Sequence, residues 1–404
     1  MTKCNVNNVA NIDADDWLMP PWPVFDEDDI KAVTRVLQSG KVNYWTGENV
    51  NRFEVEFAKR FGARYAVALA NGTVALELSL HALGIGPGDE VITTCRSFIA
   101  SASAVVMCGA IPIFADVDTD SQNITADTVA KVLTPRTRAI IVVHLAGCPC
   151  EMDPIMELAR KHSLKVIEDC AQAHGATYRG KSVGSIGDVG AFSFCTDKIM
   201  PTGGEGGMLI TNDKALWKRA WAYKDHGRNY AAAHTLNKKL GFHWLYDTFG
   251  TNWRMTEMQA ALGCMALIKL DEWLSIRRRN ARLLTEALHG IPVLRLPQPP
   301  PHMEHAYYKY YGFLCPDYLQ PAWNRQRILQ SFEKLGVPGM TGICGEIYLE
   351  KAFKDAGLGP LERLPNARHL NDTSVMFHVH PTLKSDDIYI MADRIRKVLF
   401  MACR

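Results

Sequence analysis

The chain has 404 residues, of which 47% are hydrophobic and 22% charged, and its formal net charge is +2 at pH 7. This length exceeds what one hydrophobic core usually serves, so we expect two domains with the composition of an ordinary globular protein. The basic residues are scattered along the chain rather than gathered into one stripe, which argues against a nucleic-acid-binding protein.

The cysteines and the N-terminal residues indicate the compartment. Eleven cysteines are spread over the whole chain, and we interpret this odd number as reduced thiols. Residues 1–17 are polar and acidic and do not resemble a signal peptide or an anchor, and no uninterrupted apolar stretch reaches membrane-spanning length. We therefore expect a cytoplasmic protein that does not interact with membranes or nucleic acid.

The first predicted element is a helix that begins near the capping residue Asp26 and ends at Gly40. Short β-rich runs then recur with helical or loop segments between them, and several are apolar throughout, as strands buried on both faces must be. This pattern predicts a mostly parallel sheet covered by helices, which is an α/β fold. The seven predicted strands are residues 65–70, 90–94, 111–115, 139–143, 164–167, 190–194 and 207–211.

A long amphipathic pattern follows the capping residue Thr256 and continues to Leu288, just before Gly290. The proline-rich run at residues 297–301 then interrupts the chain. An alternating segment at residues 308–314, a helix near 324–335 and a final helix from Ser385 predict a smaller α+β domain. We divide the chain into an N-terminal extension (1–25), a large α/β domain (26–265) and a smaller C-terminal α+β domain (266–404).

Candidate catalytic and ligand-binding residues lie at the ends of two predicted strands. Asp169 directly follows the apolar strand at residues 164–167, while Ser193 and Lys198 bracket the end of the strand at residues 190–194. Open α/β sheets bind ligands at the carboxyl ends of their strands. Pyridoxal phosphate would explain the set, because it needs an amine for its aldehyde, a carboxylate for its ring nitrogen and donors for its phosphate.

Two further segments fit the same cofactor. Gly72, Thr73 and Val74 lie between the strand at residues 65–70 and an apolar helical run, so their backbone amides would face an anion. Phe98, in the loop after the strand at residues 90–94, would lie flat on the pyridine ring, a contact typically worth about 0.5–1.5 kcal/mol beyond area burial.

Each of these residues also has an ordinary structural interpretation when it is taken alone. A lysine is most often solvated, an aspartate after a strand often caps a helix, and glycines often serve turns. Cys148 and Cys150 lie close after His144, but a second ligand pair at zinc-site spacing is missing, so we expect no metal site there. The case for a cofactor site therefore depends on the whole set.

Six blocks of the sequence, in order, resemble signature sequences of the DegT/StrS-type nucleotide-sugar aminotransferases, which are fold-type-I pyridoxal-phosphate enzymes. The blocks are NGTVAL at 71–76, SFIAS at 97–101, EDCAQAHG at 168–175, SFCTDK at 193–198, GEGG at 204–207 and NWRMTE at 252–257. The resemblance implies that Lys198 holds the cofactor as a Schiff base, that Asp169 pairs with the ring nitrogen and that Gln172 reaches the ring hydroxyl. It assigns the phosphate to Gly72, Thr73, Val74 and Ser193, and the stacking ring to Phe98.

The resemblance also implies partners and a reaction. Asn252 would reach the phosphate bound in a neighbouring subunit, so the active form would be a homodimer with shared active sites. Glutamate, or else glutamine, would supply the amino group, pyridoxamine phosphate would carry it, and a nucleotide-linked 3- or 4-keto hexose would receive it. Such a reaction serves the biosynthesis of amino sugars, surface polysaccharides or glycosylated metabolites.

Two alternatives remain open from the sequence. One is a sugar dehydratase of the same fold, although members with that activity usually have histidine where this chain has Lys198. The other is a regulator that binds the cofactor without turnover. Residues 342–348 depart from the histidine-containing stretch that common family members place near the sugar nucleotide, so the identity of the sugar is open as well.

Overall fold

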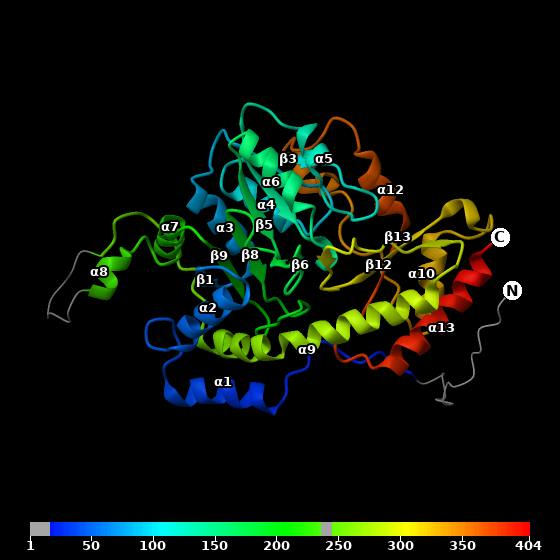
Figure 1. The fold of residues 1–404 in the computed structure, drawn as a ribbon, viewed down its shortest axis with the longest axis horizontal. Coiled ribbons are helices and arrows are strands. Elements are labelled where there is room, and N and C mark those ends of the chain that lie inside the picture. The colour runs from blue at the N-terminus through cyan, green and yellow to red at the C-terminus, as the bar shows by residue number, and fades with distance from the viewer. Residues whose placement is uncertain (1–16, 236–244) are drawn as a thin grey trace.

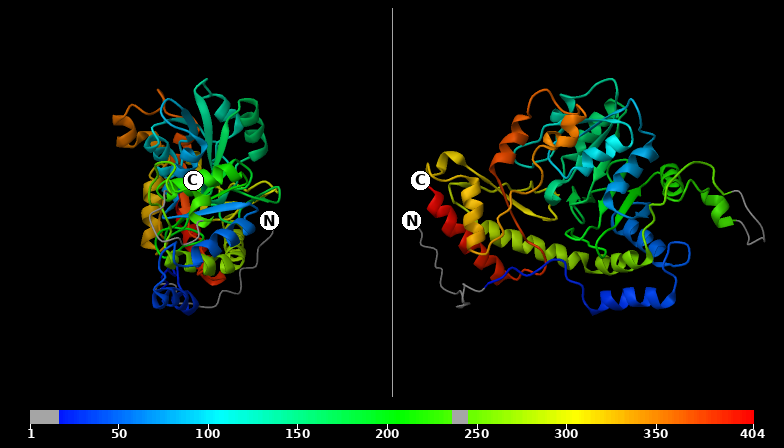
Figure 2. Two further views of the ribbon diagram at one scale, coloured as in Figure 1. Left: turned by 90° about the vertical axis from the view of Figure 1, so that its left-hand side faces the viewer. Right: turned by 180° about the vertical axis from the view of Figure 1, so that it is seen from behind.

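The structure is a computed structural model of the chain that describes residues 17–235 and 245–404. Most of the N-terminal extension, residues 1–16, lies outside the described residues. Two further views are given in Figure 2.

A seven-stranded sheet with the strand order β1-β9-β8-β5-β4-β2-β3 forms the centre of the fold. The five strands from β8 to β3 are mutually parallel, and β9 runs antiparallel to both of its neighbours. The mostly parallel seven-stranded sheet predicted from the sequence is therefore confirmed. Its strands are β1 (Tyr65–Leu69), β2 (Glu90–Thr94), β3 (Ile111–Ala115), β4 (Thr137–Val143), β5 (Lys165–Asp169), β8 (Val189–Ser193) and β9 (Gly207–Thr211).

Helices join these strands and cover the sheet (Figure 1). The predicted helix after Asp26 is α1 (Glu27–Ser39), where the Asp26 side chain accepts the amides of the first turn and Gly40 ends the helix at a φ of 67°. The remaining helices of this part are α2 (Asn49–Arg60), α3 (Gly72–Leu83), α4 (Ala100–Met107), α5 (Ala126–Ala130), α6 (Met152–Lys161), α7 (Lys214–Lys224) and α8 (Tyr230–Thr235). Helix α3 packs against β8 and β9 and against its neighbours α4 and α7, which places its N-terminus beside the end of β8.

Helix α9 (Glu257–Leu288) is a single 32-residue helix that runs beneath the sheet and the C-terminal elements (Figure 1). Thr256 caps it as predicted, by accepting the amide of Gln259. Helices α1, α2 and α13 (Ser385–Ala402) all pack against it. The Glu257 carboxylate accepts the amides of Asn49 at 2.7 Å and Val50 at 3.0 Å and so ties the start of α9 to the start of α2.

The C-terminal part is the small α+β unit that the sequence predicts. Its antiparallel sheet has the order β10-β12-β13, with β10 (Leu294–Arg295), β12 (Tyr310–Leu314) and β13 (Ser374–Phe377). Its helices are α10 (Arg325–Lys334), α11 (Lys351–Asp355), α12 (Pro365–Thr373) and α13. A second small sheet, with β11 (Met303–Glu304), β6 (Thr177–Tyr178) and β7 (Lys181–Ser182), was not predicted and links the two parts of the chain. Within residues 17–235 and 245–404, no helix has the length and apolar character needed to cross a membrane.

Candidate active site

The predicted carboxylate and the predicted lysine lie at one edge of the central sheet. Strands β5 and β8 are parallel neighbours, with Asp169 opposite Ala191. Asp169 and Ser193 are the last residues of these two strands, and Lys198 follows in the loop after β8. The sheet therefore brings together the carboxylate, the hydroxyl and the amine that the sequence singled out.

Asp169 is a buried carboxylate held by two donors. Its Oδ2 accepts the Ser101 hydroxyl at 2.7 Å, and its Oδ1 accepts the Ala171 amide at 3.1 Å. Burial raises the pKa of the Asp169 carboxyl, while these hydrogen bonds and the positive charge of Lys198 act in the opposite direction. A nearby nitrogen that carries a proton would stabilise the ionised form of this carboxylate, because a buried charge needs a partner. Ser101 lies in one of the family-like blocks, but its contact with Asp169 was not predicted.

The amine of Lys198 lies beside an aspartate and a tyrosine. Its Nζ is 3.4 Å from the hydroxyl oxygen of Tyr308 and 3.7 Å from Oδ1 of Asp197, and the Tyr308 hydroxyl donates to Asp197. Burial raises the pKa of Asp197, but the charge of Lys198 and the hydrogen bond from Tyr308 outweigh it and hold this pKa below its ordinary value. The pair therefore offers the lysine one carboxylate and one hydroxyl oxygen.

The predicted phosphate cradle is the junction between α3 and the end of β8. The Asn71 side chain accepts the amide of Val74 at 3.0 Å, and in the described part of the chain no protein acceptor is bonded to the amides of Gly72 and Thr73. A Cβ atom on Gly72 would lie 2.5 Å from the Cβ of Ser193, so a residue larger than glycine would push the helix away from the serine. Free helix amides and a serine hydroxyl at one point are the kinds of donor that suit an anion.

Gln172 is oriented by the backbone of the turn that follows β4. Its Oε1 accepts the amide of Ala146 at 2.8 Å, so its Nε2 is the end left to donate to another group. That Gln172 reaches the ring hydroxyl of the cofactor stays a prediction.

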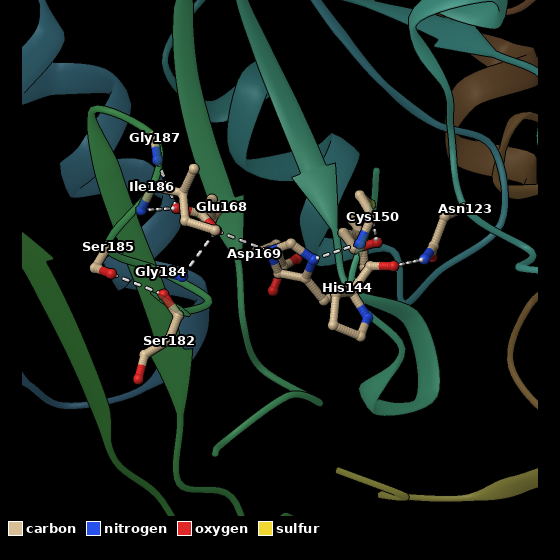
Figure 3. Close-up of polar contacts among 12 residues, drawn as sticks. Asn123, His144, Cys150, Glu168, Asp169, Ser182, Gly184, Ser185, Ile186 and Gly187 are labelled. Carbon is tan, nitrogen blue, oxygen red and sulfur yellow. Dashed lines mark hydrogen bonds and ion pairs between the residues drawn. The ribbon is translucent and has the colours of Figure 1, made fainter. Parts of the chain in front are cut away.

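His144, directly after β4, and Glu168 of β5 lie side by side and form hydrogen bonds with the loops around them (Figure 3). The Cys150 amide donates to Nδ1 of His144 at 3.0 Å, so Nε2 carries the proton and donates to Oε2 of Glu168, also at 3.0 Å. The Glu168 carboxylate also accepts three backbone amides from the loop before β8, those of Gly184, Ile186 and Gly187. His144, Glu168 and Cys170 lie close enough to hold a metal, but these hydrogen bonds engage the lone pairs that an ion would need.

Phe98 and Asn252 lie at the surface. Phe98 is 58% exposed and precedes Ser101 on the segment that contacts Asp169. Asn252 is exposed and pairs through its backbone with Asp225. Among the residues that the structure describes, no hydrogen bond or ion pair links Asn252 to Lys198 or Asp169. Both side chains are therefore open to a ligand or to another chain.

Additional basic groups, which the sequence reasoning missed, surround Tyr308. Lys309 places its Nζ 4.9 Å from the centre of the Tyr308 ring and 3.4 Å from Nδ1 of His378, and burial lowers its pKa to about 8. The buried Arg277 of α9 donates to the backbone carbonyls of Tyr307 and Tyr308, at 3.3 Å each. The site thus carries an excess of positive charge, which suits anionic ligands.

Comparison with known proteins identifies the family. Residues 23–396 match the DegT/DnrJ/EryC1/StrS aminotransferase family. The chain belongs to this family. It is therefore an aminotransferase with the fold-type-I architecture, and membership in the DegT/DnrJ/EryC1/StrS family implies pyridoxal phosphate as the cofactor.

Curated members of the DegT/DnrJ/EryC1/StrS family align with much of this chain. The chain is 34% identical to the dTDP-3-amino-3,4,6-trideoxy-alpha-D-glucose transaminase of Streptomyces venezuelae, over 91% of this chain and 90% of that protein. It is 47% identical to the GDP-perosamine synthase of Caulobacter vibrioides, but that alignment covers only 57% of this chain and 60% of the relative. A solved aminotransferase from Psychrobacter cryohalolentis is 51% identical, covers 95% of this chain and 99% of its own, and superposes with a TM-score of 0.93.

Proposed function

We propose that this aminotransferase carries pyridoxal phosphate on Lys198 and transfers an amino group from glutamate to a nucleotide-linked 3- or 4-keto hexose. The observation that carries the proposal is the pairing of two strand ends, because β5 and β8 bring the buried Asp169 carboxylate and the Lys198 amine to one edge of the sheet. When bound, the cofactor supplies an aldehyde that condenses with amines and a ring that accepts electrons.

The residues of the chain fit this cofactor in separate roles. Asp169 holds a proton at the ring nitrogen, and Gln172 donates from Nε2 to the ring oxygen. The free amides of Gly72 and Thr73, with the Ser193 hydroxyl, bind the phosphate. The Val74 amide, which the resemblance also assigns to the phosphate, already donates to the Asn71 side chain. The exposed ring of Phe98 covers the pyridine. Ser101 supports Asp169 through its hydroxyl.

Lys198 has a second role as a base and an acid. Once its Nζ is free, it takes a proton from one carbon atom and returns it to another, a contribution typically worth about 10²–10⁴-fold in rate. Asp197 and Tyr308 orient the amine for this transfer through the contacts at 3.7 and 3.4 Å. These residues keep Nζ within the site whenever it is not covalently bound.

The proposal that the acceptor is a nucleotide-linked sugar is supported by the names of relatives and not by contacts in the structure. One relative is named GDP-perosamine synthase and another is named for a dTDP-linked amino sugar. These names support a role in amino-sugar biosynthesis, and the spore coat polysaccharide biosynthesis protein SpsC of Bacillus subtilis, 33% identical over 93% of this chain, supports a role in polysaccharide biosynthesis. Residues 342–348 adjoin the site, since the Ile347 amide donates to the Cys95 carbonyl at 2.8 Å, and we propose that this stretch helps to select the sugar nucleotide.

We propose that the active form is a homodimer in the cytoplasm. The exposed side chain of Asn252 would complete the phosphate site of the neighbouring subunit. We also retain the division into residues 26–265 and 266–404, with α9 shared between the two domains because it crosses that boundary without a break.

Two observations weigh against the alternatives. The resemblance associates dehydration with histidine at the position of Lys198, so lysine favours transfer. Tyr308 and Asp197 hold the Lys198 amine when it is not covalently bound, and a regulator without turnover does not need such contacts. A regulator would bind the cofactor but release no product.

The proposal is tested with GDP-, dTDP- and UDP-linked 3- and 4-keto sugars, incubated with the enzyme and either glutamate or glutamine. We expect repeated turnover with one sugar class, seen as an amino-sugar product by mass spectrometry and NMR. The Lys198→Ala variant is the control for uncatalysed amination. Failure of every sugar to react, with a protein that binds pyridoxal phosphate, would leave the regulator as the better interpretation.

A further inference from the structure

The carbonyl oxygen of Lys198 has a partner from the N-terminal part of the sequence. The indole Nε1 of Trp22 donates to it at 3.0 Å, across 176 positions of the chain. The Lys198 amide in turn donates to the carbonyl of Cys195, also at 3.0 Å. Both backbone polar groups of the lysine are therefore fixed, one by its own loop and one by Trp22.

The loop that carries Lys198 is held at its ends by its own hydrogen bonds. There, the Thr202 amide donates to the Phe194 carbonyl and the Thr196 amide donates to the Gly204 carbonyl. Gly203 and Gly204 adopt positive φ angles in the return segment, which adds conformational freedom. The flexible side chain of a lysine reaches a defined point only if its backbone is held in place.

Trp22 belongs to a segment that crosses from the C-terminal domain to the active site. We call residues 17–25 the N-terminal strap. The Pro21 carbonyl accepts the Thr382 hydroxyl at 2.9 Å, and the Trp17 indole donates to Asp387 at 2.8 Å. The strap is thus anchored at two points on the C-terminal domain before it reaches Lys198.

The ring of Trp22 is itself held by three neighbours. Trp273 meets it edge-on with ring centres 5.2 Å apart, His380 lies parallel to it at 6.3 Å, and the Arg277 guanidinium is 5.2 Å from its centre. A ring packed from several sides has few rotamers left, so its N–H points in a fixed direction. The donor is therefore already positioned when the lysine carbonyl meets it.

We propose that Trp22 is a positioning residue for Lys198: its indole N–H fixes the lysine backbone so that Nζ reaches the cofactor aldehyde. In that reaction the neutral amine adds to the aldehyde carbon, a C=N bond forms and water leaves. Cofactor capture in the large domain thereby depends on Trp22 and on the part of the strap next to it, which the Pro21–Thr382 hydrogen bond holds, whereas Trp17 anchors a more distant part of the strap. The proposal deepens the proposed function, since it rests on Lys198 being the lysine that binds the cofactor.

The test compares Trp22→Phe, which keeps a ring but removes the donor, with Trp17→Phe, which removes the other indole donor of the same strap. Apo-protein is mixed with pyridoxal phosphate, and the rate constant for growth of the yellow absorption band is measured. We expect Trp22→Phe to capture the cofactor about three- to tenfold more slowly, as loss of one hydrogen bond implies, and Trp17→Phe to match the wild type. Equal rates for Trp22→Phe and the wild type, or equal slowing in both variants, would overturn the proposal.

Two further measurements separate the possible failures. Borohydride reduction of the wild type followed by peptide mapping shows whether Lys198 is the labelled residue, and a label elsewhere defeats the proposed function instead. Amide hydrogen exchange in the peptide containing Lys198 reports the restraint without the cofactor. We expect faster exchange in Trp22→Phe and unchanged exchange in Trp17→Phe, and the same exchange in all three proteins contradicts the positioning role even if a variant binds the cofactor poorly.

Discussion

The Nζ of Lys198 lies 3.4 Å from the hydroxyl oxygen of Tyr308, and that hydroxyl donates to Asp197. Tyr308→Phe removes one oxygen from the lysine and one donor from the carboxylate. We expect kcat to fall about tenfold, the scale of a hydrogen bond to a charged group, and the melting temperature to fall as well, because the Asp197 carboxylate loses a donor.

A neighbouring tyrosine provides the control for this variant. Tyr310 is also buried, but its hydroxyl pairs with Thr285 at 2.7 Å instead of with the lysine. Tyr310→Phe should therefore lose some stability and keep its kcat. Equal kcat values for Tyr308→Phe and the wild type would show that the hydroxyl does not orient the amine.

Lys198→Arg keeps a positive charge beside Asp197 but removes the amine that condenses with an aldehyde. We expect the variant to bind pyridoxal phosphate without becoming fixed to it by borohydride, and to lose at least about 10²–10⁴-fold in rate. Mass spectrometry of the reduced protein gives the readout. A covalent adduct in Lys198→Arg would assign the cofactor to another lysine.

Asp169→Asn should have opposite effects on the stability of the apo-protein and on its stabilisation by the cofactor. Burial raises the pKa of this carboxyl in the folded state, so its contribution to stability is fully present below the unfolded pKa of about 3.9 and is lost as pH rises through the folded value. In the apo-protein, the free energy of unfolding of Asp169→Asn relative to the wild type should therefore increase as pH rises from about 3.9 through the folded pKa.

Bound pyridoxal phosphate should make the wild type the more strongly stabilised of the two proteins. A protonated ring nitrogen stabilises the carboxylate but not an amide, so pyridoxal phosphate should raise the melting temperature of the wild type more than that of Asp169→Asn. Urea titrations at several pH values and thermal melts with and without the cofactor provide the measurements. A pH-independent difference between the two apo-proteins would mean that Asp169 is not strained by burial.

Gly72→Ala should impair the phosphate cradle. The added Cβ would lie 2.5 Å from Ser193, so the helix must move, at a cost of about 1–3 kcal/mol in the free energy of unfolding. We also expect weaker binding of pyridoxal phosphate in a direct titration. Gly86→Ala is the control, because its Cβ would meet only the Cys108 carbonyl, at 3.9 Å. Unchanged cofactor affinity in Gly72→Ala would place the phosphate elsewhere.

Mixed dimers test whether two chains share each site. Lys198→Ala and Asn252→Ala should each be nearly inactive alone. If Asn252 serves the neighbouring subunit, a heterodimer of the two variants has both defects in one site and keeps the other site intact. We expect about half of the wild-type activity per heterodimer, measured after affinity purification with two different tags. No recovery would show that Asn252 acts within its own subunit.

The sequence predicted the central sheet well because its signals are local. Each buried strand is a short apolar run, and the caps at Asp26 and Thr256 mark helix starts by their own side chains. Strand β5 extends to Asp169 itself because the backbone pairing with β4 continues that far. The short strands β6, β7 and β11 were missed, since two-residue strands have no periodicity, and β11 pairs with β6 only after the chain has folded back over more than a hundred residues.

The candidate site was predictable where function is confined to short blocks. Asp169, Ser193 and Lys198 follow strands that are recognisable one at a time, and the parallel arrangement of the sheet then brings them together. Tyr308 and Trp22 gave no such signal, because each meets Lys198 only after the chain has folded back over more than a hundred residues. Their roles depend on tertiary contacts, which spacing along the sequence does not encode.

Helix α9 connects three parts of the molecule through side chains along its length. Glu257 holds the start of α2, Arg277 holds the carbonyls of residues 307 and 308, and Asn280 donates to the Leu383 carbonyl at 3.0 Å. An unbroken helix bends little, so it acts as a stiff rod and not as a hinge. We therefore expect the parts of the chain before and after residue 265 to keep their relative orientation, and substrate entry to depend on loops at the sheet edge.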